Sequence, residues 1–104
     1  MAITKQFLKT KPGCKVTFTL GAEEANGALS VALVGDFNNW DASANPMKKQ
    51  KNGSFRTAVT FPAEDQIMFR YLVDDWKWLN DPSADGYEFC TYANAHNSIA
   101  KLSA

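Results

Sequence analysis

The sequence predicts an all-β fold, a sandwich of two antiparallel sheets, and three observations support this prediction. Apolar and polar residues alternate with a period of two in several windows, which is the pattern of half-buried strands. Turn-forming residues separate these windows roughly every ten residues, as in sandwich folds. No window carries the apolar period of an amphipathic helix. We treat residues 1–104 as a single domain, with a leader at residues 1–13 and the sandwich at residues 14–102.

The first strands follow from the pattern of apolar residues. In residues 14–20 the apolar side chains share one face and the polar ones the other, which predicts a half-buried strand. Residues 21–27 form a polar connection, and the apolar run at residues 29–34 has the length of a buried strand. The leader has few apolar anchors, so a loosely attached strand and a short helix both stay open for it.

The second half of the chain continues in the same way. Residues 40–52 contain Pro46 and several lysines and end on Asn52-Gly53, one of the strongest hairpin signals. The strands expected after this long turn lie at residues 55–61, 67–73, 76–79 and 97–102. The strand at residues 67–73 has the longest alternation, and the Asp74-Asp75 pair makes the turn that follows it.

Charge and hydropathy exclude several classes of function. The 11 basic and 11 acidic side chains cancel, and no basic block exists, which argues against a nucleic-acid partner and against an anionic membrane surface. No stretch approaches the length of a membrane span, and the first residues lack the apolar core of a secretion signal. We therefore expect a cytoplasmic protein in a reducing compartment.

The two cysteines do not predict a metal site. Cys14 and Cys90 lie far apart in sequence, and neither has a His or Cys at metal-ligand spacing, so we expect no metal and no cofactor. Both are predicted to be small, buried or half-buried apolar side chains, and a disulfide between them stays open at this point.

The stretch at residues 31–40 is central to the chain. It begins as a buried strand, breaks at Gly35 into a turn where Asn38 and Asn39 tolerate left-handed backbone angles, and ends on Trp40. One interpretation is a core tryptophan that closes the end of a sheet. The other is a flat apolar surface held out for a ligand. Because most large aromatic side chains are buried, the stretch taken alone favours the first interpretation.

Five segments in this order and spacing resemble one known module. They are Gly35-Asp36-Phe37-Asn38-Asn39-Trp40, Met47-Lys48-Lys49, Gly53-Ser54-Phe55, Phe69-Arg70-Tyr71-Leu72-Val73-Asp74 and Trp78-Leu79-Asn80-Asp81-Pro82. The chain resembles the family 48 carbohydrate-binding module, or isoamylase N-terminal domain, from about residue 16 to residue 101. That module precedes the catalytic barrel of glycogen branching and debranching enzymes and forms the glycogen-binding domain of the AMP-activated protein kinase β subunit. The resemblance implies an immunoglobulin-like, early-set sandwich that holds an α-glucan on one face.

The resemblance also implies which residues bind the sugar. Trp40 and Trp78 match the two tryptophans on which glucose rings stack, and Arg70 stands where glycogen-binding members have a Lys that reaches sugar hydroxyls. The last binding segment of the family falls near Asn97, with His96 as a second candidate beside it.

This chain departs from the family pattern at the turn before Trp78. The family usually has Gly at the position of Asp75 and often a polar residue at the position of Trp76. Trp76 could widen the aromatic surface, or it could cover the hydrophobic edge from the opposite side.

Each candidate also has a purely structural interpretation. Trp40 could pack on Phe37, and Trp78 could cover a strand edge. Arg70 could extend over an apolar patch with its charged end in water. The remaining polar candidates could serve as turn formers, backbone caps or solvated side chains, and these are Asp36, Asp74, Asp81, His96 and Asn97.

We do not expect an enzyme. The barrel that accompanies this module needs about 250 residues or more, and no nucleophile–base pair, phosphate loop or metal spacing is present. Asp74 and Asp75 are neighbours, and two adjacent carboxylates cannot face each other across a glycosidic bond.

Two functions therefore remain in view. The first is binding of an α-1,4-glucan or maltooligosaccharide. The second is a protein-interaction module on the same sandwich, docking on a partner such as a glycogen-metabolising enzyme or a kinase, and a relict of a glycoside hydrolase family 13 enzyme is a weaker third. Exposed indoles favour the sugar, and buried ones favour the protein partner.

Overall fold

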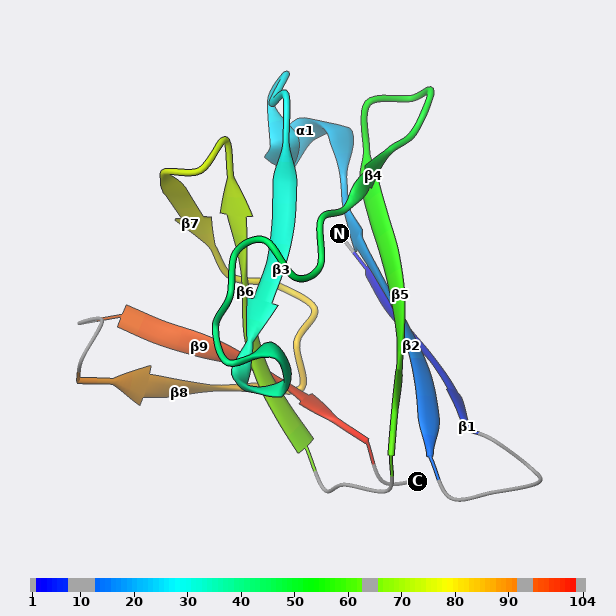
Figure 1. The fold of residues 1–104 in the computed structure, drawn as a ribbon, viewed down its shortest axis with the longest axis vertical. Coiled ribbons are helices and arrows are strands. Elements are labelled where there is room, and N and C mark those ends of the chain that lie inside the picture. The colour runs from blue at the N-terminus through cyan, green and yellow to red at the C-terminus, as the bar shows by residue number, and fades with distance from the viewer. Residues whose placement is uncertain (1, 8–12, 63–65, 92–94, 103–104) are drawn as a thin grey trace.

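Two antiparallel sheets form the fold, in a computed structural model that describes residues 2–7, 13–62, 66–91 and 95–102 (Figure 1). The four-stranded sheet has the order β1-β2-β5-β4, with bounds Ala2–Phe7, Cys14–Leu20, Phe55–Phe61 and Lys48–Lys49. The five-stranded sheet has the order β3-β6-β9-β8, with bounds Val31–Gly35, Gln66–Val73, Ala95–Lys101 and Gly86–Cys90, and β7 (Lys77–Leu79) pairs with β6. The prediction of an all-β sandwich is confirmed.

The leader is part of the sandwich, which corrects the boundary at residue 14. Strand β1 pairs with β2 along its whole length, from Ala2 opposite Thr19 to Phe7 opposite Cys14. Of the two alternatives for this segment, the strand is the one observed. Ile3 packs against the core, and Lys5 forms an ion pair with the carboxylate of Asp85. Residues 8–12 of the leader lie outside the described residues.

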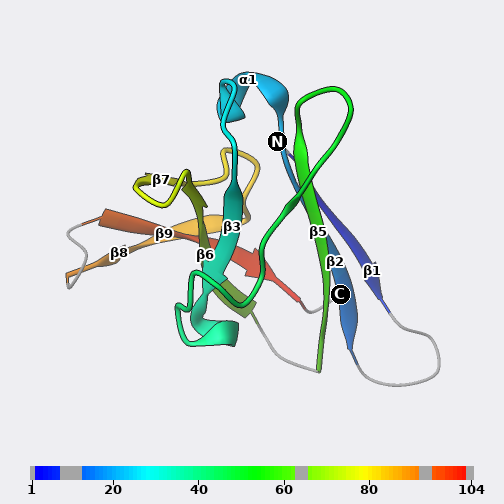
Figure 2. The same cartoon turned by 45° about the horizontal axis from the view of Figure 1, so that its top comes forward.

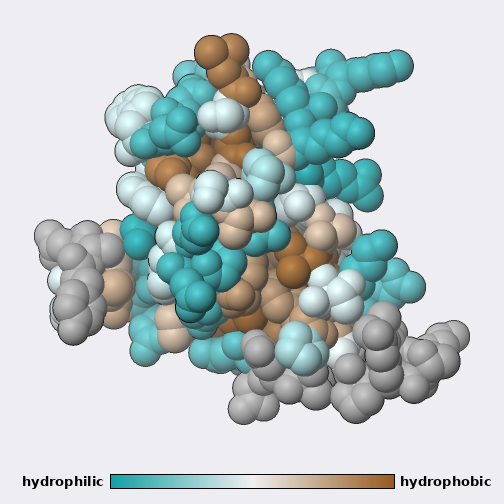
Figure 3. Space-filling model, viewed as in Figure 1, coloured by the Kyte–Doolittle hydropathy of each residue, from teal (hydrophilic) through white to brown (hydrophobic). Residues whose placement is uncertain are grey.

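Two segments expected as irregular contain short regular elements. Within residues 21–27 the chain makes one helical turn, α1 (Ala22–Ala25), which ends at Asn26 with φ 46°. Within residues 40–52 the pair Lys48–Lys49 forms β4 against β5. The hairpin expected at Asn52-Gly53 is present, since Gly53 has φ 88° and its N–H donates to the carbonyl of Gln50 at 3.0 Å. Hydrophilic side chains cover this hairpin (Figure 3).

Strand β6 lies at the centre of the five-stranded sheet. One of its edges pairs with β3, and the other pairs with β9 in its first half and with β7 in its second half. The strand expected at residues 97–102 begins two residues earlier, and the aromatic segment after Asp85 forms the edge strand β8. Strands β8 and β9 extend away from the sheet of β1, β2 and β5 (Figure 2). Among the described residues, those of β8 do not belong to the buried core between the sheets.

The core lies between the sheets and is rich in aromatic contacts. Phe18 and Phe61 come from one sheet, and Phe69 and Tyr71 come from the other. The rings of Phe18 and Phe69 meet edge to face, with centroids 5.0 Å apart. Because side chains alternate along a strand, the residues between Phe69 and its core-facing neighbours point away from the second sheet. The outer face of β6 therefore carries Met68, Arg70 and Leu72.

Asp81 lies in the β7–β8 connection and is fully buried. Its carboxylate accepts hydrogen bonds from the phenol of Tyr71 at 2.7 Å and from the N–H of Ser83 at 2.8 Å. Its own N–H donates to the hydroxyl of Ser98 at 3.0 Å. Burial raises the pKa of Tyr71, and the charge and hydrogen bond of Asp81 raise it further, so the phenol stays protonated. The bond to Ser83 is the local turn bond expected for Asp81, while the bond to Tyr71 ties the connection to β6.

The other two turn aspartates bond to distant backbone, contrary to the expectation of local turn bonds. The carboxylate of Asp36 accepts the N–H of Met68 at 3.2 Å. The carboxylate of Asp74 accepts the N–H groups of Leu29 and Ser30 at 2.8 and 3.0 Å. Both side chains therefore bond to backbone more than thirty residues away, Asp36 to β6 and Asp74 to the segment before β3.

Candidate ligand-binding site

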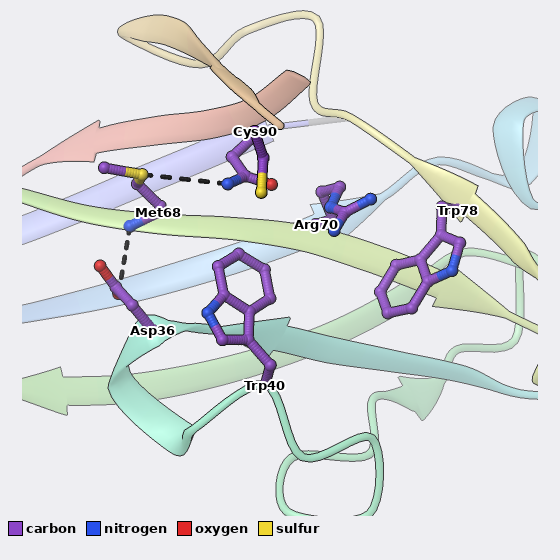
Figure 4. Close-up of a pocket in the computed structure, with 7 residues that line it drawn as sticks. Asp36, Trp40, Met68, Arg70, Trp78 and Cys90 are labelled. Atoms are coloured by element: carbon purple, nitrogen blue, oxygen red, sulfur yellow. Dashed lines mark hydrogen bonds between the residues drawn. The ribbon is translucent and has the colours of Figure 1, made fainter. Parts of the chain in front are cut away.

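A pocket of about 580 Å³ opens on the outer face of the five-stranded sheet (Figure 4). Its seven lining residues come from η1 (Asp36–Asn38), the loop after it, and strands β6 to β9: Asp36, Trp40, Met68, Arg70, Trp78, Cys90 and Asn97. Four of the six residues predicted from the sequence meet here, namely Trp40, Arg70, Trp78 and Asn97.

Arg70 lies between the two indoles. Its guanidinium carbon is 5.5 Å from the ring centroid of Trp40 and 4.6 Å from that of Trp78. Arg70 is only 9% exposed, whereas Trp40 and Trp78 are 37% and 44% exposed. Arg70 is therefore mostly covered, and its guanidinium lies against two aromatic faces rather than over an aliphatic patch alone. Two aromatic faces offset part of the cost of burying its charge.

Two buried polar atoms in this pocket have no hydrogen-bond partner among the described residues. They are Nε of Arg70, a donor, and Oδ1 of Asn97, an acceptor. Asn97 is 5% exposed, and its amide nitrogen has only a long contact, 4.0 Å, with the sulfur of Met68. Buried polar groups in native proteins are normally satisfied, so such a pair marks a place for water or a ligand group.

The loop that presents Trp40 is fixed by Asn38. The side-chain oxygen of Asn38 accepts the N–H of Gly35 at 3.0 Å, and its amide group donates to the carbonyl of Leu33 and to the side chain of Asn45. The left-handed residues are Asn39 and Trp40, both with φ 57°, rather than Asn38 and Asn39 as the sequence predicted. Positive φ is rare for a bulky side chain, so the loop holds the indole in a costly backbone conformation.

Gly35 is required by close packing at the end of β3. A Cβ at this position would lie 2.4 Å from the carbonyl oxygen of Met68 and 2.5 Å from the ring of Phe37. The backbone of β3 can therefore approach β6 only with glycine here, and this approach brings the start of the Trp40 loop beside Met68.

Trp78 is placed by the register of β7. It pairs with Leu72 of β6, so its indole lies on the outer face of the sheet. A small apolar cluster of Ala32, Val34 and Leu72 occupies the same face. The turn before β7 has positive φ at both Asp74 and Asp75, which sets the tight hairpin from which this register follows.

Trp76 and His96 do not line this pocket. Trp76 is 74% exposed and borders a separate hollow of about 130 Å³, together with Asn26 and Lys77. It therefore does not widen the surface formed by Trp40 and Trp78. His96 is exposed and meets the ring of Phe89 edge to face, with centroids 5.2 Å apart. It points to the face opposite Asn97 because the two are adjacent in one strand.

A family model matches most of the chain. The model of carbohydrate-binding module 48 (isoamylase N-terminal domain) matches residues 9–84, well over half of the chain. The chain belongs to this family. A segment of 37 residues is also 51% identical to part of a 1,4-alpha-glucan-branching enzyme of Emericella nidulans. That segment covers 36% of this chain and 5% of the enzyme, so the chain spans a small fraction of its relative's length.

The match to carbohydrate-binding module 48 covers only part of the pocket. We call the side formed by Trp40, Arg70 and Trp78 the first wall, and the side formed by Cys90 and Asn97 the second wall. The match includes Trp40, Arg70 and Trp78 but ends before Cys90 and Asn97, whereas the sequence resemblance was expected to reach residue 101. The position of Cys90 in the second wall therefore follows from the pairing of β8 with β9, in which Cys90 lies opposite Ala95.

Three lining residues were not predicted from the sequence, namely Met68, Cys90 and Asp36. Met68 could have been found from its two-residue spacing to Arg70. Cys90 could not have been found, because its position depends on the register between β8 and β9, and the residues around Cys90 do not predict that register. Both cysteines are free, so the structure does not contain the disulfide that the sequence left open.

Other kinds of site find no support in the part of the chain that the structure describes. These residues contain no cluster of three or more His, Cys, Asp or Glu side chains suited to a metal ion. None of the described helices is long and apolar enough to span a membrane.

Proposed function

We propose that this protein is a non-catalytic module that binds α-1,4-glucan chains, of the glycogen or starch type, in the pocket between Trp40 and Trp78. The observation that carries the proposal is the set of groups in that pocket. Two half-exposed indoles flank a buried Arg70, and an unpaired donor and an unpaired acceptor lie beside them.

These groups suit a sugar in two ways. The apolar faces of a glucose ring stack on an indole, which offers a large rigid surface at low entropy cost. A sugar hydroxyl is both donor and acceptor, so it suits a pocket lined by the guanidinium of Arg70 and the side-chain amide of Asn97, each with an atom that lacks a partner among the described residues. Membership of a carbohydrate-binding family supports the same ligand class.

The pocket also fits binding better than catalysis. Asp36 is the one carboxylate among its lining residues, and its side chain already accepts a backbone N–H of β6. Hydrolysis of a glycosidic bond uses a facing pair of carboxyl groups. The activity named for the branching-enzyme relative belongs to that much longer protein.

Docking on a protein partner is the second candidate function. The observation that favours it is exposed apolar surface outside the pocket, at Trp76 and at Leu29. A hydrophobic protrusion is visible at the tip of the molecule above β3 (Figure 3). A partner such as a glycogen-metabolising enzyme or kinase stays a prediction, as does the cytoplasmic location. The half-exposed indoles of the pocket favour the sugar over this alternative.

Titration with maltoheptaose tests the proposal, read by calorimetry and by intrinsic tryptophan fluorescence. Two or three stacked rings bury little surface, so we expect a dissociation constant on the order of 10 µM to 1 mM. Trp40→Ala and Trp78→Ala should each weaken binding at least about tenfold, through loss of a stacking surface worth roughly 1.5–3 kcal/mol. Trp76→Ala is the matched control and should bind within about twofold of the wild type.

The proposal fails if the wild type shows no binding at millimolar maltoheptaose, or if both pocket variants bind as well as the wild type. Circular dichroism of each variant checks that it is folded. An equal loss in Trp76→Ala would move the binding surface away from the pocket.

A further inference from the structure

Cys90 is a free thiol inside the pocket. It lies at the last position of β8, half-buried, and lines the same cavity as Arg70 and Asn97. Figure 4 shows Cys90 and Trp40 on opposite sides of β6, so the thiol faces the space between the two walls. Neither the family match nor the sequence assigns a role to this residue, since the match ends at residue 84.

The unpaired polar atoms are the reason to place this thiol beside the proposed ligand site rather than on plain surface. Arg70 and Asn97 are both more than nine-tenths buried, and each presents an atom without a partner among the described residues. A group attached to Cys90 would therefore occupy space next to the atoms that a ligand is expected to satisfy.

The second cysteine provides a contrast. Cys14 is fully buried in β2, and its thiol has a long contact, 3.9 Å, with the carbonyl of Lys15. Thiol exchange requires access to the attacking sulfur, so a reagent in solution can reach Cys90 but not Cys14 in the folded protein.

We propose that Cys90 is a thiol modification site and that a mixed disulfide formed there closes the glucan pocket. The inference rests on the proposed function and adds regulation of the same site. The co-reactant is a low-molecular-weight disulfide such as glutathione disulfide. The Cys90 thiolate attacks one of its sulfur atoms, a new S–S bond forms, the old S–S bond breaks, and the leaving thiolate takes up the proton lost by Cys90. A reducing thiol reverses the step.

Steric competition is the basis of the expected effect. A glutathionyl group is a tripeptide, and when attached to Cys90 it would enter the same cavity of about 580 Å³ as a glucose ring stacked on Trp40 or Trp78. Bound glucan should in turn shield the thiol, because ligand and reagent exclude each other.

The first test measures thiol reactivity in the native protein with the aromatic disulfide DTNB. We expect one reactive thiol per chain, lost in Cys90→Ser, with the second thiol of the wild type reacting only after unfolding in guanidinium. Saturating maltoheptaose should slow the reaction at Cys90 at least tenfold. A Cys90 that does not react, or that reacts at the same rate with and without bound maltoheptaose, overturns the inference and leaves the proposed function standing.

The second test compares maltoheptaose affinity before and after treatment with glutathione disulfide, with mass spectrometry to confirm one adduct. We expect at least a tenfold loss of affinity that dithiothreitol restores. Cys14→Ala should respond like the wild type. Cys90→Ser is compared with itself, because the substitution can change the affinity for maltoheptaose. Treatment with glutathione disulfide should leave the affinity of this variant unchanged.

The outcomes separate the two proposals. Unchanged affinity in the singly modified wild type overturns closure of the pocket. Failure of the reduced wild type to bind maltoheptaose overturns the proposed function and, with it, closure of a glucan pocket. The DTNB measurement without sugar still tests whether Cys90 is a reactive thiol.

Discussion

Asp74 and Asp75 occupy two left-handed positions in a row, with φ 51° and 65°. They are the central residues of the turn between β6 and β7, closed by the N–H of Trp76 and the carbonyl of Val73 at 3.2 Å. Such a turn favours glycine at its second position. The two aspartates are not equivalent, because the carboxylate of Asp74 holds two backbone N–H groups of the segment before β3.

Asp75→Gly should therefore stabilise the protein. Relief of the left-handed strain outweighs the added freedom of glycine in the unfolded chain, and we expect the free energy of unfolding to rise by about 0.5–1 kcal/mol. Urea denaturation measures the change. Asp74→Gly is the matched control and should lower the same free energy, since it removes both hydrogen bonds. A loss of stability in Asp75→Gly would show that its side chain has a structural role of its own.

Tyr71→Phe tests the buried carboxylate of Asp81. The variant keeps the ring in the core and removes one donor to a side chain that is fully buried, so we expect a loss of about 1–3 kcal/mol in unfolding free energy. Tyr87→Phe is the control, because its hydroxyl donates to the neutral carbonyl of Asp81 and the residue is exposed. A larger loss in Tyr87→Phe than in Tyr71→Phe would contradict this account.

Among elements, the loop from β3 to β4 matters most for the site, and Asn38 holds it. Asn38→Ala removes three hydrogen bonds that hold this loop together, so Trp40 should leave its left-handed conformation. We expect a loss of about 1–2 kcal/mol in stability and a weakening of maltoheptaose binding comparable to that of Trp40→Ala. Asn39→Gly keeps the positive φ at its position and should preserve both properties. Calorimetry and urea denaturation of the two variants provide the comparison.

Strand β1 is tied to the other sheet through Asp85. Burial raises the pKa of this carboxyl, but hydrogen bonds from the ammonium of Lys5 and the N–H of Lys101 outweigh burial and hold its pKa below the usual range. A depressed carboxyl pKa contributes stability that is fully present above its unfolded value, about 3.9, and is lost as pH falls through the folded value. The stability gap between wild type and Asp85→Asn should therefore shrink as the pH drops below about 4. Urea denaturation measures this gap between about pH 2 and about pH 6, a range that brackets the unfolded pKa. A gap that stays constant with pH would refute the link between the ionisation of Asp85 and stability.

The elements that sequence could predict are those with strong periodicity. Strands β2 and β5 have the bounds expected from their alternation, because each buries one face against the same core. Strand β1 carries Thr4, Lys5 and Gln6 in its middle, so its pairing depends on the free edge of β2 rather than on an apolar face. Helix α1 is a single turn, too short to show a period.

The same reasoning applies to the site. Residues on β6 and β7 could be nominated, since motif and alternation put Arg70 and Trp78 on one face. Cys90 needed the pairing of β8 with β9, which joins residues through a connection that no local pattern specifies. The left-handed conformation of Trp40 is likewise imposed by Asn38 and its partners against the preference of the residue itself.

For the whole molecule, charge balance decides which ligands it can attract. The chain carries 11 basic and 11 acidic side chains, and the pocket is lined by one cation, Arg70, and one carboxylate, Asp36. A neutral glucan gains nothing from long-range attraction in such a field, and its contacts are stacking and short hydrogen bonds. An anionic ligand would instead depend on Arg70 through an interaction that salt screens.

Binding of maltoheptaose should therefore be nearly independent of ionic strength. We expect its dissociation constant to change less than about twofold between 50 and 500 mM NaCl, a range over which the Debye length falls from about 14 to about 4 Å. Arg70→Gln should weaken binding by the same factor at both salt concentrations, because the guanidinium acts as a hydrogen-bond donor and stacking partner rather than as a long-range charge. Calorimetric titration of both proteins at the two salt concentrations gives the four constants needed. A tenfold loss of wild-type affinity for maltoheptaose at high salt would contradict this account of stacking and short hydrogen bonds.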